Sequence, residues 1–402
     1  MDDLDVLIVG GGLVGASLAI ALDGSGLRVA LAEAVPLRAN AQPSYDERNL
    51  ALARATVNAL TNLGVWAHVA AKSTPIRKIH VSRAGEFGVA RLAAAAHGLD
   101  AFGAVLPARE LGNALLARLD ACRSLARLAP AKVCEIVQGN DAVTVRLENG
   151  SGDVRRRTRL LVGADGTDSF VRTALGIDVE RVDYAQTAFV TTLTPERTPE
   201  AAYERFTASG PVALLPLSGG RVGVVLTVPA AQGARVAALD DAGFVAEVQR
   251  RFGWRLGRLD RPGRRVSYAL TRVLARRLTA ARAALVGNAA QTLHPIAAQG
   301  FNLGLRDALT LAELLGEGPQ GLDPGSPELL SEYARRRADD RAGTAAMSDV
   351  LARWTASDSP PLKVLRSLGL LAIDRIAPLQ AALVRRGMGF RGTPPRLALA
   401  PP

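Results

Sequence analysis

The chain has few of the residues that build metal sites and disulfide frameworks. Its 402 residues include two cysteines, Cys122 and Cys134, and four histidines, at positions 68, 80, 97 and 294. The cysteines lack CxxC spacing, and the histidines lack the spacing of metal ligands. We therefore expect no metal site, and cysteines that stay reduced as small buried residues.

The chain also lacks an uninterrupted apolar run long enough to cross a membrane. The best candidate, residues 4–22, is broken by four glycines and begins among Asp2, Asp3 and Asp5. An acidic start is the wrong sign for a signal peptide, and the glycines favour a strand, a turn and a helix over a spanning helix. We expect a cytoplasmic protein, and peripheral attachment to the inner face of a membrane stays open.

Lysine is scarce, although the chain is basic overall. Only four of its 49 basic residues are lysines, and its formal net charge is +11. The basic residues are scattered and no nucleic-acid-binding motif accompanies them, so we expect no nucleic-acid partner. The arginine clusters at 155–157 and 335–337 are interpreted as solvated faces, with a role at a membrane surface or a partner as the alternative.

What the sequence does contain is a strand, a glycine turn and a helix near its N-terminus. Residues 6–9 are wholly apolar, as in a parallel strand that is covered on both faces. In the turn, Gly10 permits a tight bend, Gly12 the close approach of a pyrophosphate, and Gly15 helix packing. Glu33 ends the next strand, where a carboxylate accepts hydrogen bonds from a ribose. The pattern predicts a dinucleotide site, with a ligand-free glycine turn as the alternative.

Two further apolar strands run into glycine turns. The second turn contains Asp165 and Gly166; its carboxylate can hold a ribose or ribitol hydroxyl, and a turn without a ligand explains it equally well. The third turn leads through Pro295 into a helix predicted over 300–315. The N-terminus of such a helix can stabilise negative charge on a reduced flavin ring. His294, within this turn, fits a structural histidine better than a functional one.

The remaining pattern predicts alternating helices and strands. Helical periodicity covers residues 48–64 and 109–120, and paired strands are expected over 133–147. Amphipathic strands over 184–228 indicate a separate antiparallel sheet with one wet face. A Gly/Pro loop at 316–327 precedes a helical and basic C-terminal part.

In their order and spacing, the three turns resemble those of the class A flavin monooxygenases, and among them the FAD-dependent hydroxylases of ubiquinone biosynthesis. Supporting matches are Asp46-Glu47-Arg48, Leu63-Gly64-Val65-Trp66, Tyr203-Glu204-Arg205-Phe206-Thr207 and the segment 210–217. The third turn, from Gly287 to Pro295, is similar to that of the 2-octaprenyl-6-methoxyphenol hydroxylases. Two positions depart from the wider family: Asn288 stands where an Asp is usual, and Ala298 stands where a Gly is usual.

The resemblance implies an α/β fold: an FAD-binding Rossmann-like βαβ domain with an inserted antiparallel-sheet substrate domain and a C-terminal helical region. We predict that the FAD-binding domain covers 1–75, 105–180 and 280–345, the substrate domain 76–104 and 181–279, and the helical region 346–402. The implied cofactor-binding residues are Gly10, Gly12, Gly15, Glu33, Arg48, Arg109, Asp165, Gly166, Asn288, Pro295, Gly300 and Asn302. The implied substrate side consists of Leu215, Pro216, Leu217 and Pro295, and no residue stands out as a catalytic base.

The implied activity is that of an FAD-dependent NAD(P)H:O2 oxidoreductase. NADH or NADPH reduces FAD, O2 forms a C4a-hydroperoxyflavin, and this species hydroxylates a prenylated methoxyphenol in ubiquinone biosynthesis. The alternatives are a hydroxylase for another ring position or another aromatic substrate, and a non-catalytic protein that binds a prenylated partner. An apolar product and a basic C-terminal region also suggest docking on a membrane or in a quinone-biosynthesis complex, with a plain helical cap as the alternative.

Overall fold

The computed structural model describes residues 3–38, 42–43, 45–150, 152–317, 323–356 and 359–401. Of the predicted Gly/Pro loop at 316–327, residues 318–322 lie outside the described residues, as does Asp2 of the acidic N-terminal segment.

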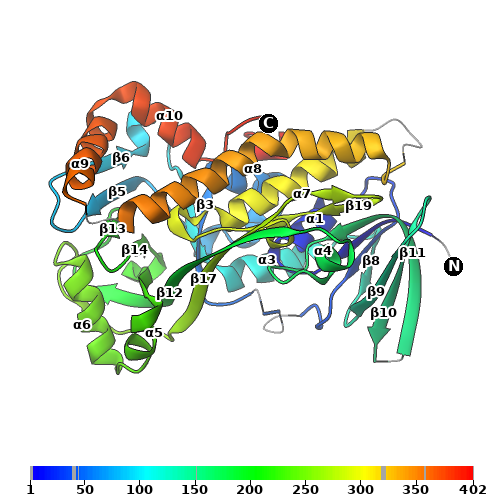
Figure 1. The fold of residues 1–402 in the computed structure, drawn as a ribbon, viewed down its shortest axis with the longest axis horizontal. Helices are drawn as coiled ribbons and strands as arrows, with labels where there is room; N and C mark the ends of the chain where they lie inside the picture. Colours follow the sequence, from blue (N-terminus) through cyan, green and yellow to red (C-terminus); the bar gives the residue numbers. More distant parts are fainter. Residues whose placement is uncertain are drawn as a thin grey trace.

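A parallel sheet forms the centre of the part of the molecule that carries the N-terminus (Figure 1). Its strand order is β18-β19-β11-β1-β2-β8, and the neighbours from β19 to β8 run parallel, while β9 and β10 continue from β11 as an antiparallel extension. Its strands are β1 (Leu4–Val9), β2 (Val29–Ala32), β8 (Leu125–Leu128), β9 (Lys132–Gln138), β10 (Val143–Asn149), β11 (Gly152–Gly163), β18 (Thr279–Ala280) and β19 (Ala283–Leu285).

The predicted N-terminal βαβ unit is confirmed. Val6, Leu7 and Ile8 of β1 are completely buried, as the unbroken apolar run requires of a strand that is covered on both faces. Helix α1 (Leu13–Ala21) connects β1 to β2 and packs against α3 and α7. The other helices of this part are α2 (Arg54–Asn62), α3 (Ala108–Asp120), α4 (Phe170–Ala174), α7 (Gln299–Glu317) and α8 (Pro327–Ala356).

A second, largely antiparallel sheet follows the order β20-β17-β12-β15-β14-β13-β5-β6, with β16 paired to β12. Helices α5 (Ala230–Ala237) and α6 (Asp241–Phe252) cover one of its faces, where Phe189, Val224 and Phe244 share one apolar core. Its strands are β5 (Lys78–Arg83), β6 (Val89–Ala93), β12 (Val179–Pro195), β13 (Ala202–Phe206), β14 (Val212–Pro216), β15 (Val222–Pro229), β16 (Leu259–Asp260), β17 (Val266–Ala275) and β20 (Gln291–Thr292). The separate antiparallel sheet is thereby confirmed.

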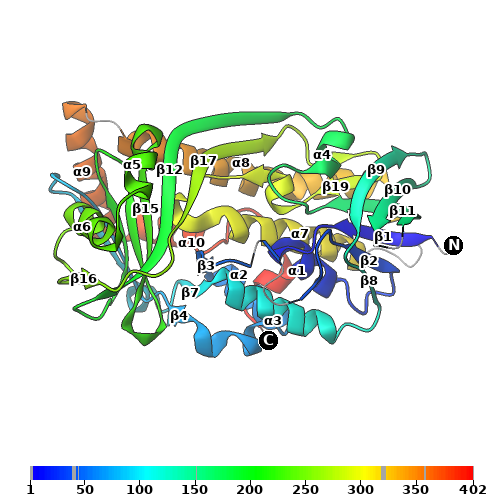
Figure 2. The ribbon, with the colours of Figure 1, turned by 90° about the horizontal axis from the view of Figure 1, so that it is seen from below.

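Strands β12 and β17 form a long antiparallel ribbon that joins the two parts of the molecule. Both ribbon views show β12 running from the neighbourhood of α4 to the second sheet (Figures 1 and 2). The pairing continues from Val179 opposite Ala275 to Val190 opposite Val266, with one irregularity between Asp183 and Thr187.

The prediction of one helix over residues 48–64 is wrong at its start. Residues Asn49–Ala53 form strand β3, and helix α2 begins only at Arg54. The sequence NLALA fits a helix or a strand equally well, and pairing with β7 (Gly103–Pro107) makes it a strand. A Cβ at Gly103 would overlap the carbonyl of Leu52, so glycine lets the two backbones approach. Strands β3, β7 and β4 (Thr74–Pro75) make a small third sheet.

Two helices follow α8 and lie against the second sheet. They are α9 (Pro360–Arg375) and α10 (Ala377–Gly387), and the chain then returns to α2, where Asn62 donates a 2.8 Å hydrogen bond to the carbonyl of Leu397. Within the described ranges, no single helix is long and apolar enough to cross a membrane. By length and composition alone, the pair 361–375 and 377–387 would suffice, but it is bent by 92°.

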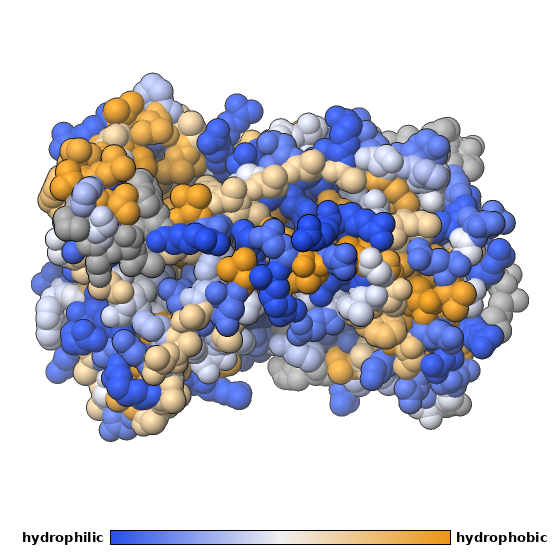
Figure 3. Space-filling view, viewed as in Figure 1, coloured by the Kyte–Doolittle hydropathy of each residue, from blue (hydrophilic) through white to orange (hydrophobic). Residues whose placement is uncertain are grey.

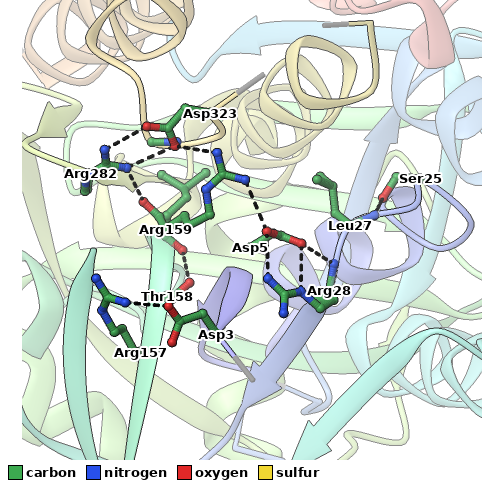
Figure 4. A network of polar contacts seen from close by, with 12 residues as sticks. Asp3, Asp5, Ser25, Leu27, Arg28, Arg157, Thr158, Arg159, Arg282 and Asp323 are labelled. Atoms are coloured by element: carbon green, nitrogen blue, oxygen red, sulfur yellow. Dashed lines mark hydrogen bonds and ion pairs between the residues drawn. The ribbon is translucent and has the colours of Figure 1, made fainter. Parts of the chain in front are cut away.

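A network of ion pairs between aspartates and arginines lies at the end of the parallel sheet where β1 begins (Figure 4). Asp5 of β1 pairs with Arg28 at 3.3 Å and with Arg159 of β11 at 3.4 Å. Arg159 and Arg282 both pair with Asp323, at 3.4 and 2.7 Å. These partly exposed pairs connect β1, β11 and β19 to the segment that precedes α8.

The interpretation of the arginines at 335–337 as a solvated face is wrong for two of the three. Arg335 is exposed and pairs with Glu332, whereas the side chain of Arg336 is 11% exposed and that of Arg337 is 1% exposed. Consecutive residues on a helix point in directions about 100° apart, so a run of three charges cannot occupy one solvated face.

Arg337 belongs to a cluster of buried charges between α7 and α8. Its guanidinium donates to Asp307 at 2.7 Å and to Asp340 at 2.8 Å. Arg306 donates to the same Asp340 at 2.7 Å. All four side chains are at most 3% exposed, so each charge depends on its partners rather than on water.

The contribution of this cluster can be measured with Arg337→Met. Removing the guanidinium leaves Asp307 and Asp340 short of a partner in a dry environment, so the free energy of unfolding should fall by about 3–5 kcal/mol. Arg335→Met, two residues away on the exposed face of α8, should leave it nearly unchanged. Chemical denaturation of the two variants measures both free energies of unfolding. Equal losses would show that the buried cluster stabilises the fold no more than an exposed ion pair does.

Candidate active site

Three glycine turns lie side by side at one edge of the parallel sheet. β1, β11 and β19 are parallel neighbours, so the turns that follow them leave the sheet at the same edge. The amide of Ala164 donates to the carbonyl of Val9 at 2.8 Å, and the amide of Val286 donates to the carbonyl of Gly163 at 3.0 Å. Helix α1, which follows the first turn, and helix α7, which follows the third, pack against each other (Figure 2).

In the first turn, Gly10, Gly12 and Gly15 have different structural roles. Gly10 has φ +106°, a conformation that favours glycine, and a Cβ there would collide with Ala164. A Cβ at Gly15 would overlap the carbonyl of Gly10. Gly12 has an ordinary φ of −64° and begins α1 without a side-chain cap, so the backbone itself does not require glycine there. A missing side chain beside uncapped helix N–H groups is the arrangement that admits a phosphate.

Glu33 lies at the end of β2, next to the first turn. Its carboxylate accepts hydrogen bonds from the amide of Gly11 at 2.6 Å and from the amide of Val35 at 3.1 Å. The group is partly accessible, so lone pairs remain for the hydroxyls of a ribose. The structure thus places Gly10, Gly12, Gly15 and Glu33 in one site.

The second turn is tied to the third. The carboxylate of Asp165 accepts from the hydroxyl of Ser169 and, at 3.0 Å, from the amide of Val171, so it holds the start of α4. Burial raises the pKa of Asp165. Gly166 has φ +88°, and a Cβ there would meet no atom within 4 Å, so open space lies beside it. Arg172 bridges to the third turn by donating to the carbonyl of Ala289 at 2.9 Å.

The predicted residues of the third turn line accessible space. Asn288 and Pro295 are exposed, and a Cβ at Gly300, in the first turn of α7, would meet no atom within 4 Å. The turn lies close to α1, because a Cβ at Gly287 would press on Val14. Room beside the N-terminus of α7, next to the first turn, is where a flat ring joined to a pyrophosphate would fit.

The side chain of Asn302 is buried and binds backbone groups of the protein. Its side-chain oxygen accepts from the amide of Ala53 at 2.8 Å, and its nitrogen donates to the carbonyls of Ala51 at 2.9 Å and Ala298 at 2.8 Å. The amide therefore holds β3 against the loop before α7. Ala298 has φ +49°, in the left-handed region, so the alanine in place of the family's glycine is strained by roughly 1–2 kcal/mol.

Arg48 and Arg109 come together at the edge of the third sheet. The amide of Ala108 donates to the carbonyl of Arg48 at 2.8 Å, Arg48 pairs with Asp46 at 2.8 Å, and Arg109 pairs with Glu47. Both side chains are 40% exposed. The hydroxyl of Tyr45 donates to the carbonyl of Gly11 at 3.1 Å, which fixes this segment beside the first turn.

His294 has the contacts of a structural residue. Its Nδ1 accepts from the amide of Ile296 at 3.2 Å, so the ring proton is on Nε2, which faces the side-chain oxygen of Gln186 at 3.0 Å. Burial lowers the pKa of His294 to about 4, and the ring is therefore neutral at physiological pH. The ring connects the loop before α7 to strand β12.

On the predicted substrate side, the residues of β14 and the extended residue after it, Leu217, alternate between two faces. Leu215 and Leu217 are partly accessible and join a cluster that includes Ala51 of β3. Pro216, which was predicted on the substrate side as well, is buried, and alternation places it on the opposite face, with Leu214. Leu215 and Leu217 thus face β3, the strand that Asn302 binds to the loop before α7.

Comparisons with known proteins agree with this geometry. A model of the FAD binding domain family matches residues 3–347. Ubiquinone hydroxylase UbiL of Rhodospirillum rubrum is 39% identical over 398 residues, which cover 98% of this chain and 92% of that protein. The chain belongs to the FAD-dependent ubiquinone hydroxylase family.

The 3-demethoxyubiquinol 3-hydroxylase of Escherichia coli is 32% identical over 394 residues, covering 96% of this chain and 98% of that protein. The crystal structure of p-nitrophenol 4-monooxygenase from Pseudomonas putida superimposes with a TM-score of 0.79 at 20% identity, covering 97% of this chain and all of that one, and it supports the fold. This family member is thus an FAD-dependent monooxygenase, as the resemblance implied.

Sequence reasoning missed two residues of this hydroxylase that hold its turns together. Asp307 accepts from Gln291 and, at 3.4 Å, from the amide of Gly287, and Arg172 joins the second turn to the third. A signal for Asp307 exists, because Arg306 and Asp307 interrupt a helix that is otherwise apolar between Leu303 and Leu309. Charges inside such a helix must be paired within the protein.

Gly12→Val tests the first turn as the place of the pyrophosphate. The purified parent should contain about one FAD per chain. The valine fits the backbone but occupies the phosphate position, so affinity for FAD should fall at least about tenfold. Gly150→Val, in a hairpin turn where a Cβ meets no atom within 4 Å, is the matched control and should retain FAD. Full FAD content in the Gly12 variant would exclude this role for the turn.

Proposed function

We propose that this protein hydroxylates the ring of a prenylated methoxyphenol in ubiquinone biosynthesis, consuming NADH or NADPH and O2. The observation that carries the proposal is the position of β3. Ala51 of β3 belongs to the same apolar cluster as Leu215 and Leu217, and Asn302 binds β3 to the loop before α7. An apolar substrate wall and the flavin site therefore share one strand.

The names of the relatives support this substrate class. UbiL is named a ubiquinone hydroxylase, and the relative from Escherichia coli is named for hydroxylation of 3-demethoxyubiquinol at position 3. The second name favours one specific alternative, hydroxylation at another position of the same kind of ring. Comparing the products formed from prenylphenols that differ in which ring carbon is free would separate the two.

Bound FAD would supply the redox chemistry, by accepting a hydride from NAD(P)H and activating O2 for transfer of one oxygen atom. The chain must hold the ring beside the flavin and keep water away, since activated oxygen is otherwise lost as peroxide. Gly12, Glu33 and the N-termini of α1 and α7 would hold the cofactor. Leu215 and Leu217 would present the apolar surface to the ring and its prenyl tail.

Leu215→Gln should uncouple the reaction while leaving FAD bound. An amide of similar size brings hydrogen-bonded water into a site that has to stay dry. We expect a severalfold fall in hydroxylated product per NAD(P)H consumed and a matching rise in hydrogen peroxide. Val137→Gln, on exposed strand β9, should stay coupled like the parent. Unchanged coupling in the Leu215 variant would remove this segment from the active site.

We also propose that α9 and α10 dock on the surface of an anionic lipid bilayer. Two buried polar side chains of these helices form ion pairs with the second sheet: Arg366 pairs with Glu86 at 2.6 Å, and Asp374 with Arg91 at 2.7 Å. Several of their apolar side chains face outward instead and form the orange patch over α9 and α10 in Figure 3. Its members are 44–54% exposed: Val364, Leu365, Leu368, Ile376 and Leu379.

The charges around this patch favour a lipid surface over a protein partner. Arg375, Arg385 and Arg386 are exposed at its border, and a bent pair of helices with an apolar outer face can lie within a headgroup layer. Arginines beside buried apolar groups gain about 1 kcal/mol each from anionic lipids. A prenylated substrate dissolved in the bilayer would then be close to the enzyme.

Vesicle co-sedimentation tests the docking. Leu365→Ser combined with Leu368→Ser should weaken binding to phosphatidylglycerol-containing vesicles at least about tenfold, because two exposed leucines lose their burial in lipid. Val137→Ser removes a comparably exposed apolar group from β9 and should bind like the parent. Arg385→Glu with Arg386→Glu should weaken binding to anionic vesicles selectively. A parent that stays in the supernatant with every vesicle would refute docking on lipid.

A further inference from the structure

Glu204 is a carboxyl group on the substrate-facing side of the second sheet. It lies on β13, opposite Ala213 of β14 and opposite Val81 of β5. Directly opposed residues share a face, so Glu204 is on the face of Ala213 and Leu215. Its neighbour Tyr203 is on the other face, where its ring packs edge-on against Phe252 of α6, with 5.6 Å between centroids.

No group of the described chain satisfies this carboxylate. The carboxylate of Glu204 makes no hydrogen bond and no ion pair with the residues that the structure describes. It is nevertheless surrounded by protein, and burial raises its pKa to about 7. The side chain keeps some accessible surface, so a ligand can reach it. A half-buried carboxyl group with a raised pKa and no protein partner is typical of a functional site.

The charged groups on neighbouring elements are occupied elsewhere. On β5, Lys78 pairs with Glu200 at 2.9 Å and Arg83 pairs with Glu86 at 2.8 Å. On α9, Asp374 pairs with Arg91, and the β14 and β15 faces toward Glu204 carry no charge. Burial is accordingly the cause of the raised pKa, and no nearby cation or anion contributes to it.

A second unsatisfied polar group flanks the same apolar wall. Asn49 of β3 is buried, and neither its amide nitrogen nor its amide oxygen has a partner. It is adjacent to Gly223, whose Cβ would collide with that amide, and Gly223 lies opposite Leu215. Leu215 is also the diagonal neighbour of Glu204, at about 7–8 Å. A ligand that reached Leu215 would meet an apolar surface with Glu204 on one side and Asn49 on the other.

We propose that Glu204 is the base that accepts the proton of the substrate's phenolic hydroxyl during hydroxylation. This rests on the proposed function, because it requires a phenol as substrate. A ring carbon forms a bond to one oxygen atom derived from O2, the O–O bond breaks, and the other oxygen atom leaves as water. The phenolic O–H bond breaks at the same time, its electron pair becomes a ring carbonyl, and its proton moves to a carboxylate oxygen of Glu204. The hydroxylated carbon then loses its hydrogen as the proton that completes the water, and Glu204 returns its own proton to the carbonyl oxygen, so the ring is aromatic again. Reducing equivalents come from NAD(P)H, so the step consumes no other reagent.

A carboxyl group with a pKa of about 7, as burial gives Glu204, suits the role of a general base. A general base works best when its pKa is close to the working pH, because it is then largely ionised and still able to hold a proton. An exposed glutamate, with its lower pKa, would be a weaker base. Asn49 would bind a second oxygen on the ring, which favours substrates that carry a methoxy or hydroxyl group besides the phenol.

The first experiment compares Glu204→Gln with Glu200→Gln in the FAD-loaded enzyme. Glu200 belongs to the same part of the chain, but it is exposed and pairs with Lys78, so it serves as the control. In the parent, the rate of hydroxylated product should rise with pH through about 7 and then level off. In Glu204→Gln the rate should be about 10²–10⁴-fold lower and this rise should disappear, while flavin reduction by NAD(P)H continues. A Glu204→Gln enzyme that keeps the parent's rate and pH profile overturns the proposal.

The second experiment needs no turnover. Binding of a methoxyphenol and of its methyl ether to the oxidised holoenzyme is followed by the change in flavin absorbance. At pH 8 the parent should prefer the phenol at least about tenfold, since only the phenol can donate a hydrogen bond to the charged carboxylate, and such bonds are stronger than neutral ones. Glu204→Leu should reduce the preference to about twofold or less, and Glu200→Gln should retain it. A preference that survives in Glu204→Leu overturns the proposal.

The two experiments separate this inference from the proposed function. If the parent hydroxylates no prenylphenol, the proposed function fails, and the binding preference still decides whether Glu204 recognises a phenolic hydroxyl. If the parent hydroxylates and the Glu204 variants behave like the parent, only the assignment of Glu204 fails.

Discussion

One buried carboxylate, Asp307, fixes the geometry on which the flavin site depends. It accepts hydrogen bonds from the amide of Gly287 and from Gln291, and it is paired with Arg337 of α8. Arg341 extends the arrangement, since it binds Gln291 and the carbonyl of Ala275 at the end of β17. Helices α7 and α8, the third glycine turn and the end of β17 thereby acquire fixed positions relative to each other. In a dry interior such a cluster specifies geometry, because any displacement leaves a charge without a partner.

The parts of the fold that local chemistry controls could be predicted from the sequence. The apolar strand before Gly10, the helix after it and Glu33 at the next strand end follow one another within 33 residues. Their structure depends on backbone sterics and on burial of both strand faces, which a short segment already encodes. The same holds for helix α3 and for the paired strands β9 and β10. The family resemblance added Asn302, and the structure shows what its amide does: it binds β3 to the loop before α7.

Features that depend on partners distant in sequence could not be predicted in this way. The segment Asn49–Ala53 becomes a strand only because β7 is available to pair with it. In the sequence Arg337 looks like the exposed Arg335, but in the structure it is buried and paired with Asp307 of α7 and Asp340 of α8. Glu204 stands in a strand whose pattern gives each face, but its lack of a partner is a property of the assembled sheets.

Ala298 illustrates a different limit. A departure from a family's usual glycine is visible in the sequence, and its consequence, a residue held at φ +49°, is visible only in the structure. The hydrogen bond from Asn302 to its carbonyl helps to hold that conformation. Strain of this kind is typical of functional loops, where surrounding contacts impose a backbone that the residue itself disfavours.

The ribbon of β12 and β17 has a consequence for how the protein unfolds. Its pairing begins beside the third glycine turn and ends inside the second sheet, so neither part of the molecule has a complete set of hydrogen bonds without the other. A linker between autonomous domains would let each melt at its own temperature. A shared ladder of hydrogen bonds couples them instead into one cooperative unit, in which loss of the cofactor part and loss of the substrate part are a single transition.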